Sequence, residues 1–405
     1  MTTVTDLVAE AAALDAADPL AHKRNEFDLD VEVAYFDGNS LGAPPKHVAD
    51  RVAAVVREQW GGRLIRSWSE GWWEAPVRVG ERIAPLVGAA PGQLVVADST
   101  SVNLFKALVA ATRLGPGRDE ILVDADTFPT DGYIADEVAR LTGRTVRRVV
   151  VEDMPREVSE RTAVALINHV DYVTGRAHDM AMLTSALHRA GALVLWDLCH
   201  SVGALPVELD AAGVDLAVGC TYKFLNGGPG APAFLYVATK WLESFEQPLA
   251  GWAGDRDPFA MRGAYEANDG IARGRAGTPD ILSLLALDAA LDVWDGVDRG
   301  LLRAKGLALG EFFFRCADEL LDGATIATPR GEDRGHQISV VDEDAAKTMA
   351  ALIERGVIGD FRPPDVLRFG LAPLYTTYGE VLRAVTTLRA LRHGNKEFPS
   401  GIGGK

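Results

Sequence analysis

Short apolar runs alternate with longer amphipathic stretches between residues 94 and 237, and this alternation constrains the fold more than any other feature of the sequence. The apolar runs are long enough for buried strands and too short for helices, whereas most stretches between them have the period of helices that bury one face. This order predicts an α/β chain in which helices cover both faces of a mostly parallel sheet. The predicted strands are 94–97, 120–123, 145–151, 163–167, 192–196, 216–220 and 233–237, and the predicted helices are 102–112, 130–142 and 177–190.

Polar and aromatic residues come directly after several of these strands. Parallel strands end at the same edge of a sheet, and that edge is where α/β proteins bind ligands. We therefore expect these side chains to lie close together. They are Thr100 and Ser101 after the first strand, Phe128 and Asp131 after the second, then Asn168, then Asp197 and His200, and finally Tyr222 and Lys223.

Each of these residues also has a simple structural explanation. Lys223 could be a surface lysine beside a glycine-rich turn, Asp197 a structural acceptor, and Thr100 a helix cap. The sequence has no glycine-rich dinucleotide fingerprint and no Walker loop. Together, however, the residues supply a helix end for a phosphate, an aromatic ring for stacking, a carboxylate for a ring nitrogen and a lysine that can form a Schiff base. Pyridoxal phosphate requires this set of groups.

The sequence resembles the kynureninases, a family with the aspartate-aminotransferase fold, over nearly its whole length. The most specific part of the resemblance is FPTD at residues 128–131 combined with RFGLAPLY at residues 368–375. The resemblance implies a type I fold of pyridoxal-phosphate-dependent transferases, with a large α/β domain and a smaller α+β domain. The matching segments are YFDGNSLG, RSW, DSTSVNLFKAL, TFPTDGYIA, HVDYVTGRAHDM, WDLCHSVGA, TYKFLNGGPG, GIARGRAGTP and GVIGDFRPPDVLRFGLAPLYTT.

The resemblance also implies a role for each matching residue. The catalytic residues would be Lys223, Tyr222 and Asp131, with Lys223 as the Schiff-base lysine and the base for the α-proton. Pyridoxal 5'-phosphate would be bound by Thr100, Ser101, Phe128, Asn168, Asp197, His200, Tyr222 and Lys223, and by Trp252 and Thr278 from a neighbouring subunit of a homodimer. The substrate would contact Arg368, Trp68, Ala253, Asn39 and Ser40, with Arg368 binding its α-carboxylate.

The reaction implied by the resemblance is hydrolysis of the Cβ–Cγ bond of L-kynurenine, or of a kynurenine with a 3-hydroxy or methyl group on its ring. The products would be an anthranilate and L-alanine. One segment departs from the family, in which Gly-Trp-Phe-Gly-His is usual where this chain reads Gly-Trp-Ala-Gly-Asp at residues 251–255. Ala253 predicts a larger pocket and a preference for a substituted ring, unless Trp72, Trp73 or Phe259 closes the pocket instead.

Two other functions fit part of this pattern. One is another enzyme of the same fold, such as an aminotransferase or a cysteine desulfurase. A desulfurase needs a mobile reactive cysteine after the lysine, but Cys316 falls inside a predicted helix, 301–321. The other is a non-catalytic protein that binds pyridoxal phosphate, and such a protein would be expected to have lost Lys223, Asp197 or Arg368.

Composition narrows the class of partner. A formal charge of −16 and a pI near 5.0 argue against a nucleic-acid or anionic-membrane surface, and favour a small molecule as the partner. The resemblance implies that this small molecule is an amino acid. The three cysteines have no metal-type spacing, which indicates free thiols in a reducing compartment, and the N-terminus does not resemble a signal peptide. We therefore expect a cytoplasmic enzyme. The expected domains are residues 61–294, and residues 1–60 with 295–405, with helices at 5–17, 45–60 and 345–355, a strand at 337–341 and a frayed tail from residue 394.

Overall fold

The computed structural model describes residues 3–393, which form two compact units. The larger unit comprises Pro44–Tyr172 and Ala177–Asp295, and the smaller unit comprises Met1–Ala43, Val173–Arg176 and Gly296–Lys405. Residues 44–60, which we expected in the smaller domain, lie in the larger unit instead. The reason is that helix α2 (Val48–Ala54) packs on helix α8 (Ile281–Ala290). The predicted frayed tail, 394–405, lies outside the described residues.

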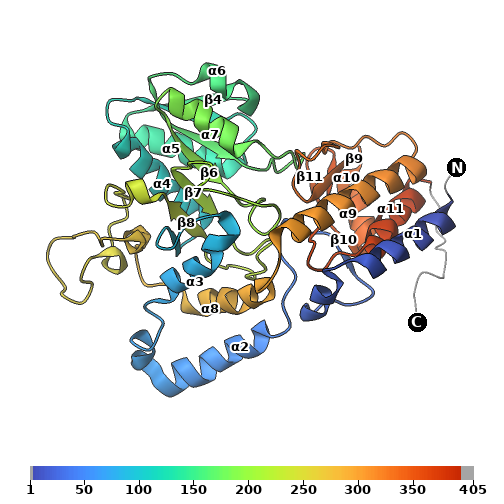
Figure 1. The fold of residues 1–405 in the computed structure, drawn as a ribbon, viewed down its shortest axis with the longest axis horizontal. Coiled ribbons are helices and arrows are strands. Elements are labelled where there is room, and N and C mark those ends of the chain that lie inside the picture. Colours follow the sequence, from blue (N-terminus) through green and yellow to red (C-terminus); the bar gives the residue numbers. More distant parts are fainter. Residues whose placement is uncertain (1–2, 394–405) are drawn as a thin grey trace. The chain divides into compact units, whose positions relative to one another are not determined.

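A seven-stranded sheet forms the centre of the larger unit (Figure 1), and all of its strands run parallel except β8, which is antiparallel to both of its neighbours. The prediction of a mostly parallel sheet is therefore confirmed. Six of the strands are buried along their whole length, as expected for a sheet covered on both faces, and edge strand β4 is the exception. In spatial order the strands are β2 (Leu94–Val96), β8 (Phe234–Val237), β7 (Leu216–Gly219), β6 (Leu193–Asp197), β5 (Thr162–Asn168), β3 (Glu120–Asp124) and β4 (Thr145–Val149).

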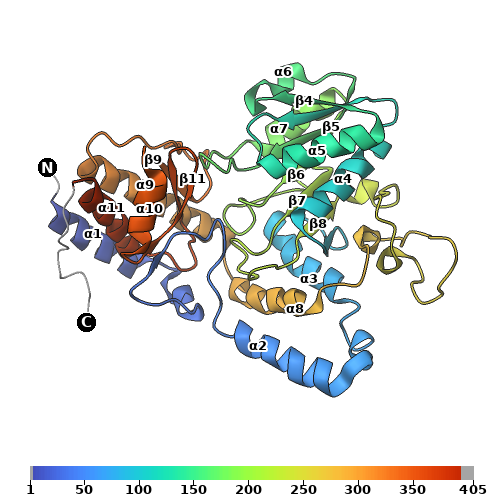
Figure 2. The ribbon, with the colours of Figure 1, turned by 180° about the vertical axis from the view of Figure 1, so that it is seen from behind.

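Helices α4 (Thr100–Leu114) and α5 (Pro129–Thr142) cover one face of this sheet, and α7 (Met180–Arg189) covers the other, as Figures 1 and 2 show. Helices α4 and α5 each start a few residues after a strand ends, whereas a longer loop separates β5 from α7. Ser99 caps α4 through its side chain, and the proline at the first position of α5 suits the start of a helix. The strand-to-helix turns therefore bring residues 97–101 and 125–131 to the carboxyl edge of the sheet. The remaining α-helices of the unit are α3 (Ala75–Ile83) and α6 (Met154–Glu157).

The helix predicted at 45–60 is only partly α-helical, because α2 changes to a π-helical segment, Val55–Gly61, before a 3-10 turn, Leu64–Trp68. Among residues 3–393, no helix is both long and apolar enough to cross a membrane.

The smaller unit packs four helices against short strands around an apolar core. Its three-stranded antiparallel sheet has the order β11 (Asp360–Arg362), β12 (Val366–Gly370) and β9 (Gln337–Val341), and a parallel pair joins β1 (Ala34–Tyr35) to β10 (Val357–Ile358). The predicted helices and strand of this unit are confirmed. The confirmed helices are α1 (Val4–Ala17), α9 (Arg299–Leu320) and α10 (Ala345–Ile353), and α11 (Tyr378–Arg392) was not predicted.

Candidate active site

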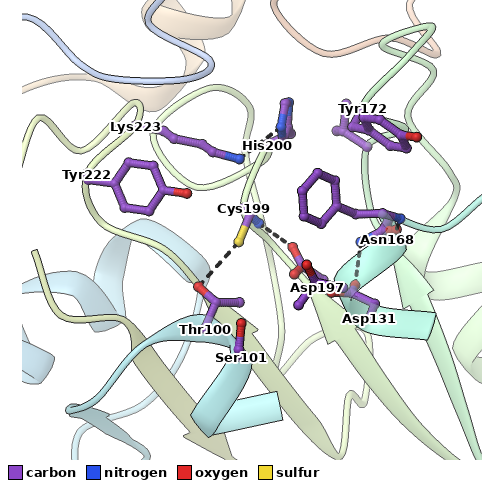
Figure 3. A pocket seen from close by; sticks show the side chains of 13 residues that line it. Thr100, Ser101, Asp131, Asn168, Tyr172, Asp197, Cys199, His200, Tyr222 and Lys223 are labelled. Carbon is purple, nitrogen blue, oxygen red and sulfur yellow. Dashed lines mark hydrogen bonds between the residues drawn. The ribbon is translucent and has the colours of Figure 1, made fainter. Parts of the chain in front are cut away.

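A cavity opens at the carboxyl edge of the large sheet (Figure 3), and the space between its side chains is about 570 Å³, part of it open to solvent. Of the predicted residues, Thr100, Ser101, Phe128, Asp131, Asn168, Asp197, His200, Tyr222 and Lys223 all line it. The remaining lining residues, Thr130, Val170, Tyr172 and Cys199, were not predicted, although each belongs to a segment that matched the kynureninases.

Lys223 lies in the irregular segment after β7 and extends its amine into the cavity. Its Nζ lies 3.0 Å from Nε2 of His200, which belongs to the loop after β6. Backbone hydrogen bonds from Gly227 to Thr221 and from Asn226 to Lys223 close the turn behind the lysine, and Asn226 takes a left-handed conformation with φ of 60°. The neighbouring Tyr222 also points into the cavity (Figure 3), and burial raises the pKa of its phenol, which therefore stays protonated at neutral pH.

Asp197 is the last residue of β6, and it is almost completely buried. Its Oδ1 accepts a hydrogen bond from the backbone N–H of Cys199 at 2.7 Å. Burial raises the pKa of this carboxyl group, because a charge in an apolar surrounding has lost its hydration. A protonated ring nitrogen beside it would stabilise the carboxylate form, so the chemistry of this site fits a pyridine ring.

Asp131 is a second buried carboxyl group of the cavity, and its side chain lies near that of Asp197 (Figure 3). Oδ2 of Asp131 accepts a hydrogen bond from Asn168 Nδ2 at 3.0 Å and lies 3.4 Å from Thr127 Oγ1. Burial, followed by the charge of Asp197, raises the pKa of Asp131 well above its usual range. Asn168 in turn accepts hydrogen bonds from the Thr127 hydroxyl at 2.6 Å and the Phe128 N–H at 3.0 Å. The network therefore fixes the loop that carries Phe128, and Thr127 is a further residue that the sequence did not single out.

The first turn of α4 supplies the anion-binding end of the cavity. Thr100 and Ser101 line this end, and the helix begins immediately after its cap, Ser99. A 15-residue helix presents free N–H groups and a positive dipole end at such a position, and both favour a phosphate. The side chain of Phe128 is half exposed, and its ring packs edge to face on the ring of Tyr172, with the two ring centroids 5.2 Å apart. The donor set of the cavity thus fits a phosphorylated aromatic aldehyde.

Four other predicted residues of the larger unit lie away from this cavity. Trp68 and Trp252 belong to one aromatic cluster, joined through Trp73, whose ring centroid lies 6.4 Å from that of Trp68 and 5.0 Å from that of Trp252. Thr278 is exposed on its loop. Ala253 is completely buried, so it can influence a ligand only through the side chains that cover it.

Asp255 stands where the family usually has histidine, and the structure gives it a local role. Its carboxylate accepts backbone hydrogen bonds from Asp257 and Glu266, at 2.9 and 3.0 Å, and pairs with Arg262 at 2.8 Å. It therefore holds together the loop from residue 255 to residue 267.

The predicted substrate residues of the smaller unit lie together. Arg368, in β12, is buried, and its Nε donates to Oδ1 of Asp360 at 2.7 Å. Ser40 donates to Oδ2 of the same aspartate at 2.9 Å, and Asn39 Nδ2 donates to Gln337 Oε1 at 2.9 Å. Burial raises the pKa of nearby Asp37 to about 6. Asp360, which was not predicted, faces Arg368 because the antiparallel register of β11 and β12 pairs the two residues.

Three solved structures have a similar fold. A cysteine desulfurase from Thermococcus onnurineus matches with a TM-score of 0.79 and 19% identity, covering 92% of this chain and 98% of that chain. A cysteine desulfurase from Escherichia coli matches with a TM-score of 0.77 and 20% identity, with the same coverage. A third structure, of a C-DES mutant with glycine covalently linked to its pyridoxal phosphate cofactor, has a TM-score of 0.79 and 17% identity over 90% of this chain and 98% of that chain. Likeness at this level of identity shows the fold, which is that of type I pyridoxal-phosphate enzymes.

Sequence comparisons identify the family. The model of the kynureninase C-terminal domain matches residues 302–388. A kynureninase from Deinococcus radiodurans is 50% identical over 394 residues, covering 95% of this chain and 96% of that protein. A kynureninase from Burkholderia pseudomallei is 47% identical over 394 residues, covering 94% of each chain. At such identity over almost the full length, the chain belongs to the kynureninase family.

Proposed function

We propose that this chain hydrolyses the Cβ–Cγ bond of L-kynurenine, or of a kynurenine with a hydroxyl or methyl group on its ring, to an anthranilate and L-alanine. The observation that carries the proposal is the cavity of the larger unit, where the predicted lysine, two carboxyl groups and an anion-binding helix end lie together. Full-length relatives that are themselves named kynureninase support the same reaction.

The cofactor is pyridoxal phosphate, and the described cavity fits it. The first turn of α4, with Thr100 and Ser101, would hold the phosphate, and Asp197 would hold the protonated ring nitrogen. Phe128 would stack on the ring, and Lys223 would form the covalent bond. When bound, the cofactor withdraws electrons from the carbon atoms of the substrate next to its amino group.

The protein's own groups would move the protons. The amine of Lys223 would take the α-proton and hold it at Nζ, where the His200 ring 3.0 Å away orients it. The Tyr222 phenol, kept protonated by burial, would donate a proton to the carbon that leaves as the methyl group of alanine. Lys223 would then return its proton to the α-carbon. One water is consumed: its oxygen ends in the carboxylate of the anthranilate, one of its protons would restore the Tyr222 phenol, and the other is released.

The substrate contacts outside this cavity are part of the same proposal. Arg368 would bind the α-carboxylate, with Asn39 and Ser40 beside it, and the aryl ring would lie against surfaces that include Trp68. Trp252 and Thr278 would complete the cofactor site of a neighbouring subunit in a homodimer. Trp252 is 37% exposed in the single chain, which leaves its ring available for such a contact. Mixing two inactive variants, Lys223→Ala and Trp252→Ala, should restore activity if each supplies what the other lacks.

The test is to incubate the pure holoenzyme with L-kynurenine, 3-hydroxykynurenine and ring-methylated kynurenines, and to measure the anthranilate and alanine formed. We expect equal amounts of the two products, and none from Lys223→Ala, which should also lose the visible absorption band of the bound cofactor after dialysis. A cysteine desulfurase would instead release sulfide from L-cysteine. The buried position of Cys316 inside α9 disfavours that reaction, and sulfide release without cleavage of any kynurenine would refute the proposal.

A further inference from the structure

Helix α4 contains a buried lysine that takes no part in the chemistry described above. The side chain of Lys106 is completely buried. Its Nζ donates to Oδ2 of Asp98 at 2.7 Å and to the backbone carbonyl of Gly274 at 2.6 Å. Burial lowers the pKa of Lys106, while the charge of Asp98 opposes that change. A lysine kept at such a position needs a reason beyond stability, because a buried ion pair rarely stabilises a fold more than apolar side chains of the same size.

The partner of Lys106 lies in the turn that starts the anion-binding end of the cavity. Asp98 comes immediately before Ser99, the cap of α4, and its φ of 54° is in the left-handed region. Few residues other than glycine adopt this conformation, and aspartate and asparagine tolerate it best. The carbonyl of Asp98 accepts a hydrogen bond from the N–H of Ala233 at 2.8 Å. The backbone path from β2 into α4 therefore depends on how Asp98 is held.

A second side chain of α4 acts on the same turn. Asn103, three residues before Lys106 and thus on the same side of the helix, is completely buried, and its Nδ2 donates to the carbonyl of Ala97 at 2.7 Å. Two side chains of α4, Asn103 and Lys106, therefore hold residues 97 and 98 through hydrogen bonds to the Ala97 carbonyl and the Asp98 carboxylate. The hydroxyls of Thr100 and Ser101 follow directly on this fixed turn.

The negative charge of Asp98 disfavours an anion at the start of α4. A carboxylate two residues before Thr100 opposes the binding of a phosphate at the helix end, whereas the helix dipole favours it. The ammonium of Lys106 cancels the charge of Asp98 without itself being exposed to the cavity.

We propose that Lys106 is a positioning residue for the cofactor phosphate, which neutralises Asp98 and holds the turn that presents the first residues of α4. This inference rests on the proposed function, because it assumes that the phosphate of pyridoxal phosphate binds at this helix end.

The experiment compares the affinity of the cofactor-free full-length chain for pyridoxal phosphate and for pyridoxal, which lacks the phosphate. Lys106→Met should weaken pyridoxal phosphate binding by about 10- to 100-fold, the size of one uncompensated charge near a partly buried anion. Pyridoxal binding should change by less than about threefold, since a neutral hydroxymethyl group does not sense the charge. The matched control is Lys305→Met, which removes the lysine of another buried Lys–Asp pair, 2.7 Å from Asp18 in the smaller unit. It should leave the preference for the phosphate unchanged.

Asp98→Asn separates charge from structure, because asparagine tolerates the same backbone conformation. If Lys106 acts through charge, this variant keeps or increases the preference for pyridoxal phosphate over pyridoxal. A merely structural pair predicts that both variants lose affinity for both ligands alike, and that result would overturn the inference. If thermal unfolding shows that Lys106→Met is not folded, Asp98→Asn decides alone. A reduced preference of Asp98→Asn for pyridoxal phosphate over pyridoxal would then refute the inference. If the wild-type chain binds neither ligand, the proposed function fails together with this inference. If the wild type binds pyridoxal phosphate and Lys106→Met binds it with the same affinity, only the inference fails.

Discussion

Replacing Arg368 with alanine should reduce kcat/KM for kynurenine by roughly 30- to 1000-fold while the affinity for pyridoxal phosphate stays unchanged. The guanidinium of Arg368 is planar and can donate two parallel hydrogen bonds to a carboxylate. Such a charge-assisted pair contributes about 2–4 kcal/mol in a site shielded from water, and each 1.4 kcal/mol corresponds to a tenfold change in rate.

The structure shows that the same replacement also affects folding. Arg368 is 1% exposed and forms an ion pair with Asp360 through Nε and Nη2. Removing one partner of a buried pair typically costs about 3–5 kcal/mol. Here Asp360 keeps the ion pair with Arg362 at 2.9 Å and the hydrogen bond from Ser40. We therefore expect a loss near the lower end of that range, about 3 kcal/mol, in the free energy of unfolding.

A double variant separates the two effects. In Arg368→Ala combined with Asp360→Ala, the buried carboxylate that lost Arg368 is gone, so part of the lost free energy of unfolding should return. The value of kcat/KM should stay low, because the contact with the substrate carboxylate is still missing. The assays are urea unfolding and steady-state kinetics on samples shown to be folded. If kcat/KM recovers together with stability in the double variant, or stays near normal in folded Arg368→Ala, then Arg368 does not bind the substrate.

Three further predictions follow from buried positions. Ala253→Phe should shift the ratio of kcat/KM values toward unsubstituted kynurenine by about 5- to 100-fold, and an unchanged ratio would show that other side chains close the ring pocket. Gly306→Ala should destabilise the smaller unit by about 1–3 kcal/mol or more in urea unfolding, because the added Cβ would lie 2.0 Å from Nε2 of buried His336; wild-type stability would mean that this ring can move. Burial, together with the positive charges of Arg303 and Arg334, lowers the pKa of His336 well below 6.5, so the unfolded chain takes up a proton that the folded chain excludes. Stability from this group should therefore be complete above about pH 6.5 and decrease as the pH falls below it, and a variant such as His336→Leu should show a smaller decrease between pH 7 and pH 5.

The site at the sheet edge was predictable because its geometry follows from strand direction alone. Once β3, β5, β6 and β7 run parallel, the residues after them must share an edge, whatever the details of packing. The pairing of Arg368 with Asp360 depends instead on the register of β11 against β12, and nothing local in the sequence sets that register. The same holds for the domain boundary, which the packing of α2 on α8 decides rather than any change of composition near residue 60.

The two aspartates of the cavity show what the structure adds to a list of predicted site residues. In the sequence, Asp131 and Asp197 are alike, since each follows a strand of the same sheet. In the structure, burial raises the pKa of both carboxyl groups, and the charge of Asp197 raises that of Asp131 further. Two neighbouring buried carboxyl groups do not both ionise easily, so the one that meets a cation takes the charge. Asp197, which would meet the protonated ring nitrogen, is then the carboxylate, and the proton remains with Asp131, where Thr127 and Asn168 surround it. Under the proposed function, environment rather than residue type would therefore give Asp197 the ring nitrogen and leave a proton on Asp131.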